Sequence, residues 1–347
     1  MPPSTSTVSS AEAEAKAKRE AAFEAAGPFA TNDPATVRWL LCGRGRPVDV
    51  TSPSPYTVVV DEGGGRVYYQ DIERSRVEAE ERWDELGYEP VPYPWYEAPP
   101  VELRDVEAAL APLRRTLSAD ETDRYRAAGA DAAEAMVETL GLLAPVLSEL
   151  EASAELARAA RRRGFVPAVD LVGGEQRQPL HRHPLPTEAP LGRHALLAIT
   201  AEREGLHVSL TRLVSFGEPP PELVELVRAA AEVDAAMLRA SRPGTTTGEV
   251  LEVAAEVYAG RGFPDEWRRH HQGGITGYRG REVFAVPGEP TPLPDSCAVA
   301  WNPSIAGGAK SEDTALVSPA GVEVITRTPE LPELEVDGLP RPAILVA

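Results

Sequence analysis

Four histidines lie in two short segments of the chain, and their side chains are suited to moving protons. His181 and His183 flank one arginine in a proline-containing turn, and His270 and His271 are adjacent. A neutral imidazole titrates near neutral pH and can serve as a general acid or base. Adjacent side chains on an extended strand point to opposite faces, so at most one of His270 and His271 should face a given pocket. A zinc site built on these two histidines would need a third ligand from elsewhere.

Arginines beside glycines form a second candidate set. Arg44 and Arg46 lie in the segment CGRGRPVD, and Arg281 directly precedes Glu282. A guanidinium group can donate two parallel hydrogen bonds to one carboxylate. These arginines could therefore bind a substrate carboxylate. The alternative is that they are solvated or pair with the abundant aspartates and glutamates.

Other common catalytic arrangements are absent from the sequence. Ser209 has no histidine and aspartate at a recognisable triad spacing, and no phosphate-binding loop or dinucleotide fingerprint is present. The two cysteines, Cys42 and Cys297, form neither a metal-binding spacing nor a disulfide framework, and we expect reduced thiols. The sequence predicts no cofactor.

Alternating helical and extended patterns would position these residues. We expect strands at 37–42, 56–61 and 66–71, the last two joined by an EGGG turn, and a helix at 73–87. An extended connection would follow over 88–100. Beyond it the pattern predicts two helices, a group of strands, two more helices and Gly/Pro-punctuated strands. The helices are expected at 118–143, 148–163, 219–241 and 246–260, and the intervening strands within 165–174, 194–202 and 206–217.

The composition is that of a globular protein with one or two domains. The chain has 347 residues, 42% of them apolar, and a formal net charge of −19. An acidic surface repels phosphate backbones, so we expect no nucleic-acid partner. No apolar run approaches the ~20 residues of a membrane span, and the polar N-terminus does not resemble a signal peptide. We therefore expect no membrane partner and a cytoplasmic location.

Five stretches resemble, in the right order, the catalytic half of the pita-bread family, which includes methionine and Xaa-Pro aminopeptidases, prolidases and the metal-free creatinases. They are GLHVSLTR (205–212), SRPGTTTGEV (241–250), HHQGGITGYRGRE (270–282), AWNPSIAG (300–307) and KSEDTALV (310–317). The resemblance implies an α+β pita-bread fold with a smaller α/β N-terminal domain, and a homodimer. The implied parts are a flexible or helical extension (1–29), the N-terminal domain (30–105), the catalytic-type domain (106–330) and a C-terminal tail (331–347).

The metal ligands of the family are largely missing from the matching positions. Peptidases of this family hold two metal ions with two Asp, one His and two Glu. The Asp positions, eleven residues apart, carry Ala198 and Ser209; the His position carries Gly274, and the first Glu position carries Asn302. Only Glu312 is retained. One carboxylate cannot hold two hard or borderline cations, so the resemblance predicts a creatinase-like member without metal.

The resemblance also implies which histidines act. In the family, a histidine about seventeen residues before the first Asp position contacts substrate, and in creatinases it is the proposed acid or base. That count selects His181, with His183 as the alternative. A second substrate-contacting histidine, four residues before the metal-binding one, falls on His270, and a local insertion would move it to His271.

The remaining candidates would bind substrate. Creatinases end the third motif with Arg-Glu, as Arg281 and Glu282 do here, and their arginine binds the substrate carboxylate. A Gly-Arg loop similar to the one with Arg44 and Arg46 reaches the partner's active site in the family dimer. Glu312 needs a cationic partner, which a substrate nitrogen, Lys310 or an arginine could supply. Asn302 can both donate and accept a hydrogen bond.

We therefore expect a metal-independent enzyme acting on a small carboxylate-bearing substrate. His181, His270 or His271, and Glu312 would be catalytic, and the reaction would hydrolyse or eliminate a C–N bond. A related proton-transfer or cyclisation step of specialised metabolism would suit the same residues. The alternatives are a catalytically inactive peptidase-like binding protein and a residual metallo-aminopeptidase.

Overall fold

The computed structural model describes residues 10–49 and 54–347, and it divides into two compact units. The first unit contains the chain up to Asp120 together with Glu204–Leu206, and the second contains Glu121–Arg203 and His207–Ala347. The interpretation of residues 1–9 as part of an N-terminal extension lies outside the described residues. Among the residues that are described, no helix combines the length and apolar character that crossing a membrane requires.

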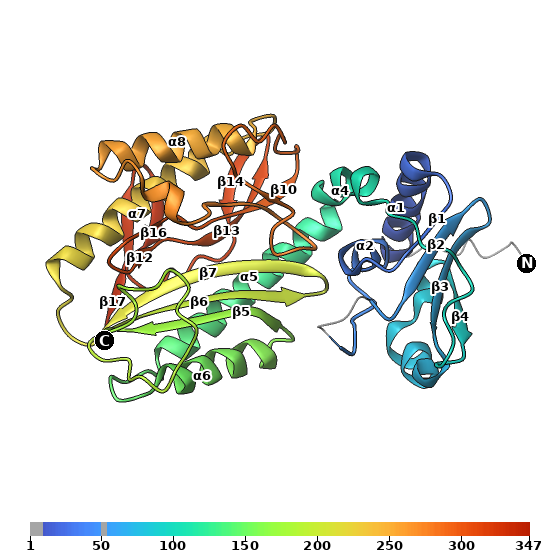
Figure 1. Ribbon diagram of the computed structural model, residues 1–347, viewed down its shortest axis with the longest axis horizontal. Coiled ribbons are helices and arrows are strands. Elements are labelled where there is room, and N and C mark those ends of the chain that lie inside the picture. The colour runs from blue at the N-terminus through green and yellow to red at the C-terminus, as the bar shows by residue number, and fades with distance from the viewer. Residues whose placement is uncertain (1–9, 50–53) are drawn as a thin grey trace, which may run out of the picture. The chain divides into compact units, whose positions relative to one another are not determined.

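The N-terminal unit is built around a four-stranded sheet with the order β1-β2-β3-β4 (Figure 1). Strands β2 and β3 form the hairpin expected from the EGGG turn, and β4 pairs with β3 in parallel. Short helical turns over residues 71–86, including α3, replace the single predicted helix and end at Gly87. The elements of this unit are α1 (Ser10–Ala26), β1 (Phe29–Thr31), α2 (Pro34–Leu40), β2 (Thr57–Asp61), β3 (Gly64–Gln70), α3 (Arg74–Arg76), β4 (Tyr88–Tyr93) and α4 (Glu107–Arg115).

The predicted strand at 37–42 is wrong, because this segment belongs to helix α2 and the turn after it. Asp33 caps the helix by accepting a hydrogen bond from the backbone N–H of Thr36 at 2.8 Å, and Pro34 fits the first helical position. All side chains from Ala35 to Leu40 are buried. A short run that is apolar on every side does not show whether it is a strand or a helix, and here the cap decides.

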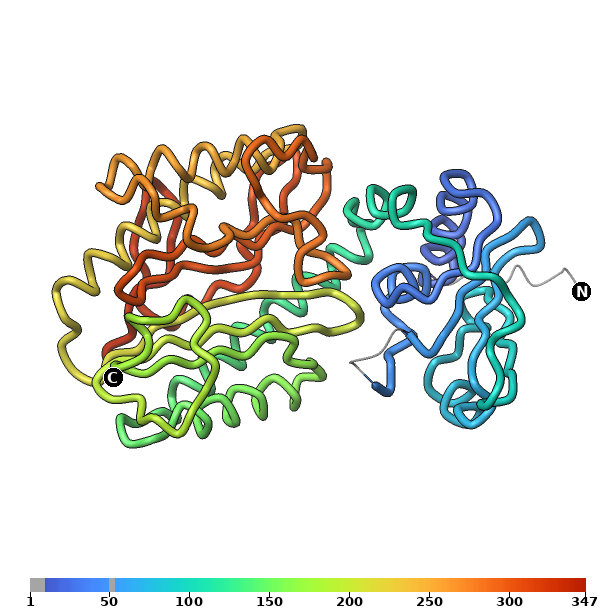
Figure 2. Tube along the Cα trace, viewed as in Figure 1, coloured from blue at the N-terminus to red at the C-terminus, as the bar shows by residue number. Residues whose placement is uncertain are grey.

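The C-terminal unit begins with two helices that accompany a mixed sheet. The four-stranded sheet has the order β17-β7-β6-β5, and helix α6 packs against β5 (Figure 1). Strand β17 pairs in parallel with β7, so the C-terminus lies at the edge of this sheet (Figure 2). The elements are α5 (Ala119–Leu140), α6 (Glu149–Arg162), β5 (Val166–Gly174), β6 (His194–Arg203), β7 (Leu206–Ser215) and β17 (Ile344–Val346).

A second pair of helices accompanies a five-stranded sheet with the order β14-β13-β10-β8-β9. Apolar side chains of both helices, including Met237 and Tyr258, form one buried core with strand residues such as Val299 and Trp301. The elements are α7 (Pro221–Ala240), α8 (Thr247–Gly260), β8 (Gly273–Thr276), β9 (Val283–Phe284), β10 (Cys297–Trp301), β11 (Ser304–Ile305), β12 (Ala309–Lys310), β13 (Asp313–Ser318), β14 (Gly321–Val324), β15 (Glu333–Val336) and β16 (Leu339–Pro342).

The two sheets of the C-terminal unit meet where β7 passes the start of β13. Thr211 donates its backbone N–H to the carbonyl of Glu312 at 3.1 Å, and the two residues form an isolated antiparallel bridge. Ser209 and Thr314 exchange two further hydrogen bonds, at 2.7 and 3.0 Å. This junction places residues from both halves of the unit around one space.

Candidate active site

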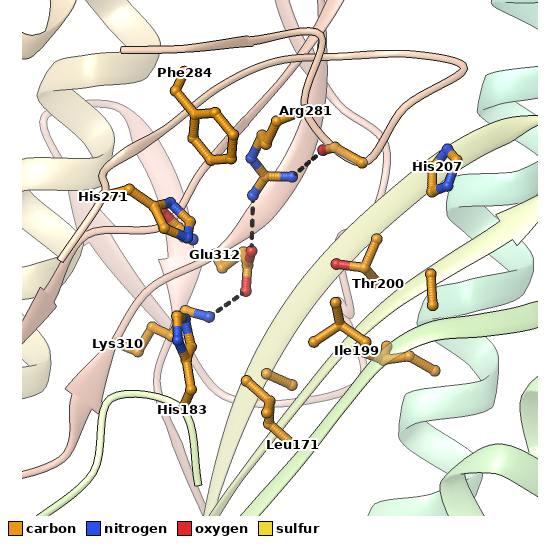
Figure 3. Close-up of a pocket in the computed structure, with 15 residues that line it drawn as sticks. Leu171, His183, Ile199, Thr200, His207, His271, Arg281, Phe284, Lys310 and Glu312 are labelled. Carbon is orange, nitrogen blue, oxygen red and sulfur yellow. Dashed lines mark hydrogen bonds and ion pairs between the residues drawn. The ribbon is translucent and has the colours of Figure 1, made fainter. Parts of the chain in front are cut away.

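A cavity of about 470 Å³ opens at the junction of the two sheets (Figure 3). This volume is in the range of small-molecule sites, which is ~300–1,000 Å³. One wall is apolar, and the other carries histidines, cations and an amide. The lining residues are Ala168, Val169, Leu171, His183, Ala198, Ile199, Thr200, His207, His271, Gly280, Arg281, Phe284, Asn302, Lys310 and Glu312.

Glu312 is held between two cations at the polar wall. Lys310 Nζ lies 2.7 Å from Oε2, and Arg281 Nη2 lies 3.3 Å from Oε1, so the two groups reach the carboxylate from opposite sides (Figure 3). Thr211 Oγ1 donates a third hydrogen bond, at 2.7 Å. Burial would raise the pKa of Glu312, but the charges of Lys310 and Arg281 outweigh it and hold the pKa below its usual range. Two cations and one carboxylate leave this wall with a net positive charge.

Buried hydroxyl groups surround the position of Ser209. Its Oγ lies 2.9 Å from Thr200 Oγ1, and Arg281 Nη1 approaches it at 3.4 Å. Arg281 also donates to the carbonyl of Gly280 at 2.6 Å. These contacts through Nη1 fix the guanidinium group of Arg281 at the edge of the cavity, while its Nη2 pairs with Glu312.

Three histidines converge beside this charged group. His183 and His271 line the cavity, whereas His270 is buried behind them. His270 Nε2 lies 3.0 Å from His183 Nε2, and the His270 and His271 rings stack with centroids 4.5 Å apart. Partial desolvation by the surrounding protein lowers the pKa of all three, with Lys310 adding to the effect, to about 2 for the buried His270 and about 4 for His271. The three imidazoles are therefore neutral at neutral pH.

His270 is held from behind by a chain of polar contacts. Its Nδ1 lies 3.2 Å from Ser304 Oγ, which accepts a hydrogen bond from Arg182 Nη1 at 2.8 Å. Arg182 in turn pairs with Glu266. Because Arg182 can only donate, the Ser304 hydroxyl is free to donate to Nδ1, which would leave the His270 proton on Nε2, facing His183.

Asn302 lines the cavity, and its amide oxygen, which is covered from solvent, is an unused acceptor. Its side chain is buried, and Oδ1 has no hydrogen-bond partner among the residues that the structure describes. A buried carbonyl oxygen without a partner is unfavourable by about 1–3 kcal/mol. A ligand N–H or O–H would remove this penalty if a small side-chain movement exposed Oδ1 to the cavity.

The other residues singled out by the sequence lie elsewhere. His181 is exposed and lines a separate cavity of about 70 Å³. Arg44, in the N-terminal unit, bonds to Glu85 and to the carbonyls of Glu81 and Arg82, and Arg46 is exposed. Glu282 accepts a hydrogen bond from the backbone N–H of Arg279 at 3.2 Å, which closes the turn before β9.

Among the cavity residues that were not sequence candidates, two aromatic rings, those of His207 and Phe284, lie near the polar groups. His207 lines the cavity and its Nδ1 lies 3.1 Å from the carbonyl of Gly277, and Phe284 packs edge-on against His271 with centroids 5.1 Å apart. His207 shares a strand face with Ser209 and Thr211, because alternate residues of a strand point the same way. That alternation is a signal that identifies His207 from the sequence.

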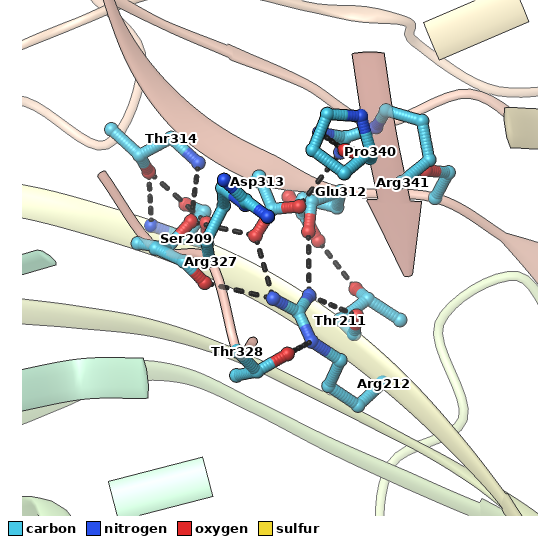
Figure 4. A network of polar contacts seen from close by, with 12 residues as sticks. Ser209, Thr211, Arg212, Glu312, Asp313, Thr314, Arg327, Thr328, Pro340 and Arg341 are labelled. Carbon is cyan, nitrogen blue, oxygen red and sulfur yellow. Dashed lines mark hydrogen bonds and ion pairs between the residues drawn. The ribbon is translucent and has the colours of Figure 1, made fainter. Parts of the chain in front are cut away.

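A salt-bridge network behind the cavity fixes the start of β13 (Figure 4). Asp313, next to Glu312, accepts from Arg212 Nη2 at 2.8 Å and from Arg341 Nη2 at 2.7 Å. Arg341 also pairs with Asp234 on α7 at 2.6 Å. All four charged side chains are almost fully buried. The network joins β7, α7 and the C-terminal hairpin to the strand that carries Glu312.

The residues at the family's metal positions do not fit a dinuclear centre. Ala198 and Gly274 offer no ligand atom, and Ser209 Oγ is engaged with Thr200. Glu312 is engaged by two cations, which repel a metal ion. At Gly274, an added Cβ would lie 1.9 Å from the carbonyl oxygen of Val283, so the backbone leaves no room for a histidine.

Gly274→Ala is expected to destabilise the protein by about 3 kcal/mol or more, at the upper end of overpacking penalties. The new Cβ would collide with backbone and not with a flexible side chain. Gly280→Ala is the matched control, because its Cβ would meet nothing closer than 3.9 Å. We expect Gly280→Ala to change stability by about 1 kcal/mol at most. Chemical denaturation of both variants measures the difference, and equal stabilities would contradict the steric argument.

Comparisons with known proteins agree with this architecture. The profile described as metallopeptidase family M24 matches residues 123–319. An uncharacterized peptidase of Staphylococcus aureus is 24% identical over 233 residues, which is 64% of this chain and 65% of the relative. The chain therefore spans slightly less than two thirds of that relative's length.

Solved structures resemble the whole chain at low sequence identity. A dipeptidase PepE from Mycobacterium ulcerans superposes with a TM-score of 0.73 at 19% identity, covering 97% of this chain and 98% of the other. A prolidase from Pyrococcus furiosus gives 0.72 at 17% identity, covering 87% and 96%. An X-Pro aminopeptidase from Thermotoga maritima gives 0.71 at 18% identity, covering 94% and 99%. These likenesses confirm the predicted pita-bread fold with its smaller N-terminal domain.

Proposed function

The chain belongs to metallopeptidase family M24, and on that premise we propose that it is a peptidase-like enzyme that works without the family's dinuclear centre. Its substrate would be a small molecule with a carboxylate and an N–H group, and the reaction would break a C–N bond by acid–base chemistry. The proposal rests on one observation: the cavity is lined by two cations, three imidazoles and the amide of Asn302, where the family places metal ions.

The charge of the cavity supports a carboxylate substrate. Arg281 and Lys310 share the single carboxylate of Glu312, so one positive charge remains uncompensated within the group. Both cations are nearly buried, with 9% and 5% of their side chains exposed, and electrostatic attraction to an anion is stronger there than in water. Because Glu312 is already paired, it is poorly placed to bind a substrate cation.

The rest of the lining indicates the other parts of the substrate. Asn302 Oδ1 would accept a hydrogen bond from the N–H next to the bond that breaks. Leu171 and Ile199 form an apolar wall, and Phe284 lies on the other side of the cavity beside His271; these side chains suit a hydrocarbon or aromatic group. An N-acylated or N-alkylated amino acid carries all three features.

His271 and His183 would move the proton, since they line the cavity and His181 does not. In hydrolysis, His271 would take a proton from water as the water oxygen attacks the carbon. The C–N bond would then break, and the same proton would pass to the departing nitrogen. In an elimination, the base would take a proton from carbon and the C–N bond would break without water. A carboxylate bound near Arg281 and Lys310 would raise the lowered pKa of His271 toward neutrality.

The cavity favours an enzyme over a catalytically inactive binding protein. Its volume of about 470 Å³ is open, and both His271 and Arg281 line it, with Phe284 packed against His271. An inactive module would have no need to keep neutral imidazoles beside two buried cations. We therefore retain the enzyme as the proposed function.

Turnover is expected to continue in excess chelator. Purified protein would be incubated with EDTA, exchanged into metal-free buffer and assayed for amine release from dipeptides, N-acyl amino acids and guanidino acids. Our proposal predicts a rate with EDTA at least as high as the rate without it, because the dinuclear ligands are missing. Activity that EDTA abolishes and that Mn²⁺ or Co²⁺ restores would instead support the residual metallopeptidase. The absence of turnover on every class, with binding retained, would support a binding protein.

A further inference from the structure

The three histidines of the cavity lie close enough to share one ligand. His183 comes from the loop between β5 and β6, whereas His270 and His271 directly precede β8. One ring nitrogen of each residue lies within 4.8 Å of the others. His270 is buried, so the protein holds its ring in place. His183 and His271 are exposed, so an ion from solvent can reach the site. We propose that His183, His270 and His271 bind one borderline transition-metal ion, of the Zn²⁺ or Ni²⁺ class.

The geometry needs only a small adjustment. His183 Nε2 and His270 Nε2 are 3.0 Å apart. Two nitrogens that each lie 2.0–2.1 Å from a tetrahedral zinc ion are about 3.3 Å apart. A shift of a few tenths of an ångström therefore converts the present contact into a pair of ligands, and His183 can make it because it is exposed and lies in a loop.

The surroundings of His270 resemble the support that metal-binding histidines need. A ligating histidine commonly donates its second N–H to an oxygen acceptor, which fixes the ring. His270 Nδ1 has Ser304 Oγ at 3.2 Å, and Ser304 is fixed by Arg182. With metal on Nε2, the His270 proton would move to Nδ1 and donate to Ser304. Imidazole nitrogens suit zinc, nickel and copper better than calcium or magnesium.

The nearby cations determine how tightly the ion is held. Lys310 and Arg281 would repel a divalent ion, although Glu312 offsets part of their charge. The same cations favour an anion as the fourth ligand, such as chloride, hydroxide or a carboxylate. This site differs from the dinuclear centre of the family, because none of its ligands occupies one of the five ancestral positions.

Metal binding here goes beyond the proposed function and has its own consequence. The ion would take the imidazole lone pairs that the proposed acid–base chemistry uses. The metal-bound form is therefore expected to be inactive in that chemistry, so the metal would act as an inhibitor. Because binding can be measured without substrate, failure of this inference and failure of the proposed function are distinguishable.

Calorimetric titration tests the inference. The full-length protein would be stripped with EDTA and titrated with ZnCl₂ or NiCl₂ in a buffer that does not coordinate metal. We expect one ion per chain. His183→Gln and His271→Gln should each weaken binding by more than about 100-fold, because loss of an outer-shell partner alone reduces affinity ~10–100-fold. Both positions are exposed, so the variants should fold, which circular dichroism would verify.

Two control variants are expected to change metal affinity in different ways: one not at all, the other by tightening binding. His181→Gln removes an exposed histidine two residues from the site and should leave affinity unchanged. Lys310→Met removes a repelling charge and should tighten binding, while Arg281 still pairs with Glu312. The inference is wrong if no saturable binding occurs below about 100 μM, which corresponds to about −5.5 kcal/mol. It is equally wrong if the His183 and His271 variants bind as well as the parent, or if His181→Gln has the same effect as they do.

Discussion

Replacing His271 by glutamine is expected to lower turnover by ~10²–10⁴-fold and to leave substrate affinity nearly unchanged, since general acid–base catalysis contributes in that range. His271 lines the cavity beside Arg281 and stacks on His270. Glutamine preserves a polar side chain of similar length but cannot titrate. The substrate would be whichever dipeptide, N-acyl amino acid or guanidino acid the enzyme turns over. Steady-state rates would give kcat, and calorimetry would give the affinity.

Two other variants make this result specific. His181→Gln should keep turnover, because His181 lines only the smaller cavity. Arg281→Met should instead weaken binding by about 2–5 kcal/mol, as expected when one partner of a buried charge pair is removed. If His181→Gln lowers turnover and His271→Gln does not, proton transfer belongs to His181, as the family resemblance implies. A loss of affinity in all three variants would contradict the separation of roles.

Much of the site follows from strand alternation and motif order in the sequence. Residues 310 and 312 are two apart in extended chain, between the end of β12 and the start of β13, and their side chains meet at the polar wall. Ala198 lies in β6 and Ser209 in β7, because a spacing of eleven residues places them on the two strands of the β6–β7 hairpin. Motif spacing thus identifies where the ligands of a dinuclear centre are missing, whereas the contact of Arg281 with Glu312 is seen only in the structure.

What the sequence could not supply is the path of the loops. His181 and His183 lie two residues apart, and only the turns before β6 determine that His183 and not His181 reaches the cavity. The pairing of His183 with His270 joins residues 87 positions apart, and no local pattern encodes such a contact. The strand predicted at 37–42 failed for a different reason, because the cap at Asp33 lies outside the apolar run.

Arg341→Met is expected to destabilise the protein by about 3–5 kcal/mol, the range for breaking a buried ion pair from one side. Arg341 contacts both Asp234 and Asp313, and all three side chains are at most 2% exposed. Asp313 would keep Arg212 and Thr326, whereas Asp234 would keep only Ser311 among the residues that the structure describes. The uncompensated charge therefore lies mainly on Asp234. Burial already raises the pKa of this carboxyl group above its usual range.

The matched control is Arg327→Met, which removes an exposed arginine paired with Glu333 at 2.8 Å. Such surface pairs contribute about 0–1 kcal/mol, so the two variants should differ several-fold in their effect on the free energy of unfolding. Adding Asp234→Asn to Arg341→Met should recover part of the loss, because it removes the unpaired buried charge. Urea denaturation of the parent protein, the two single variants and the double variant measures these differences in the free energy of unfolding. If Arg341→Met and Arg327→Met are equally stable, the hairpin that carries Arg341 does not support the strand that presents Glu312, and the network in Figure 4 contributes nothing to the site.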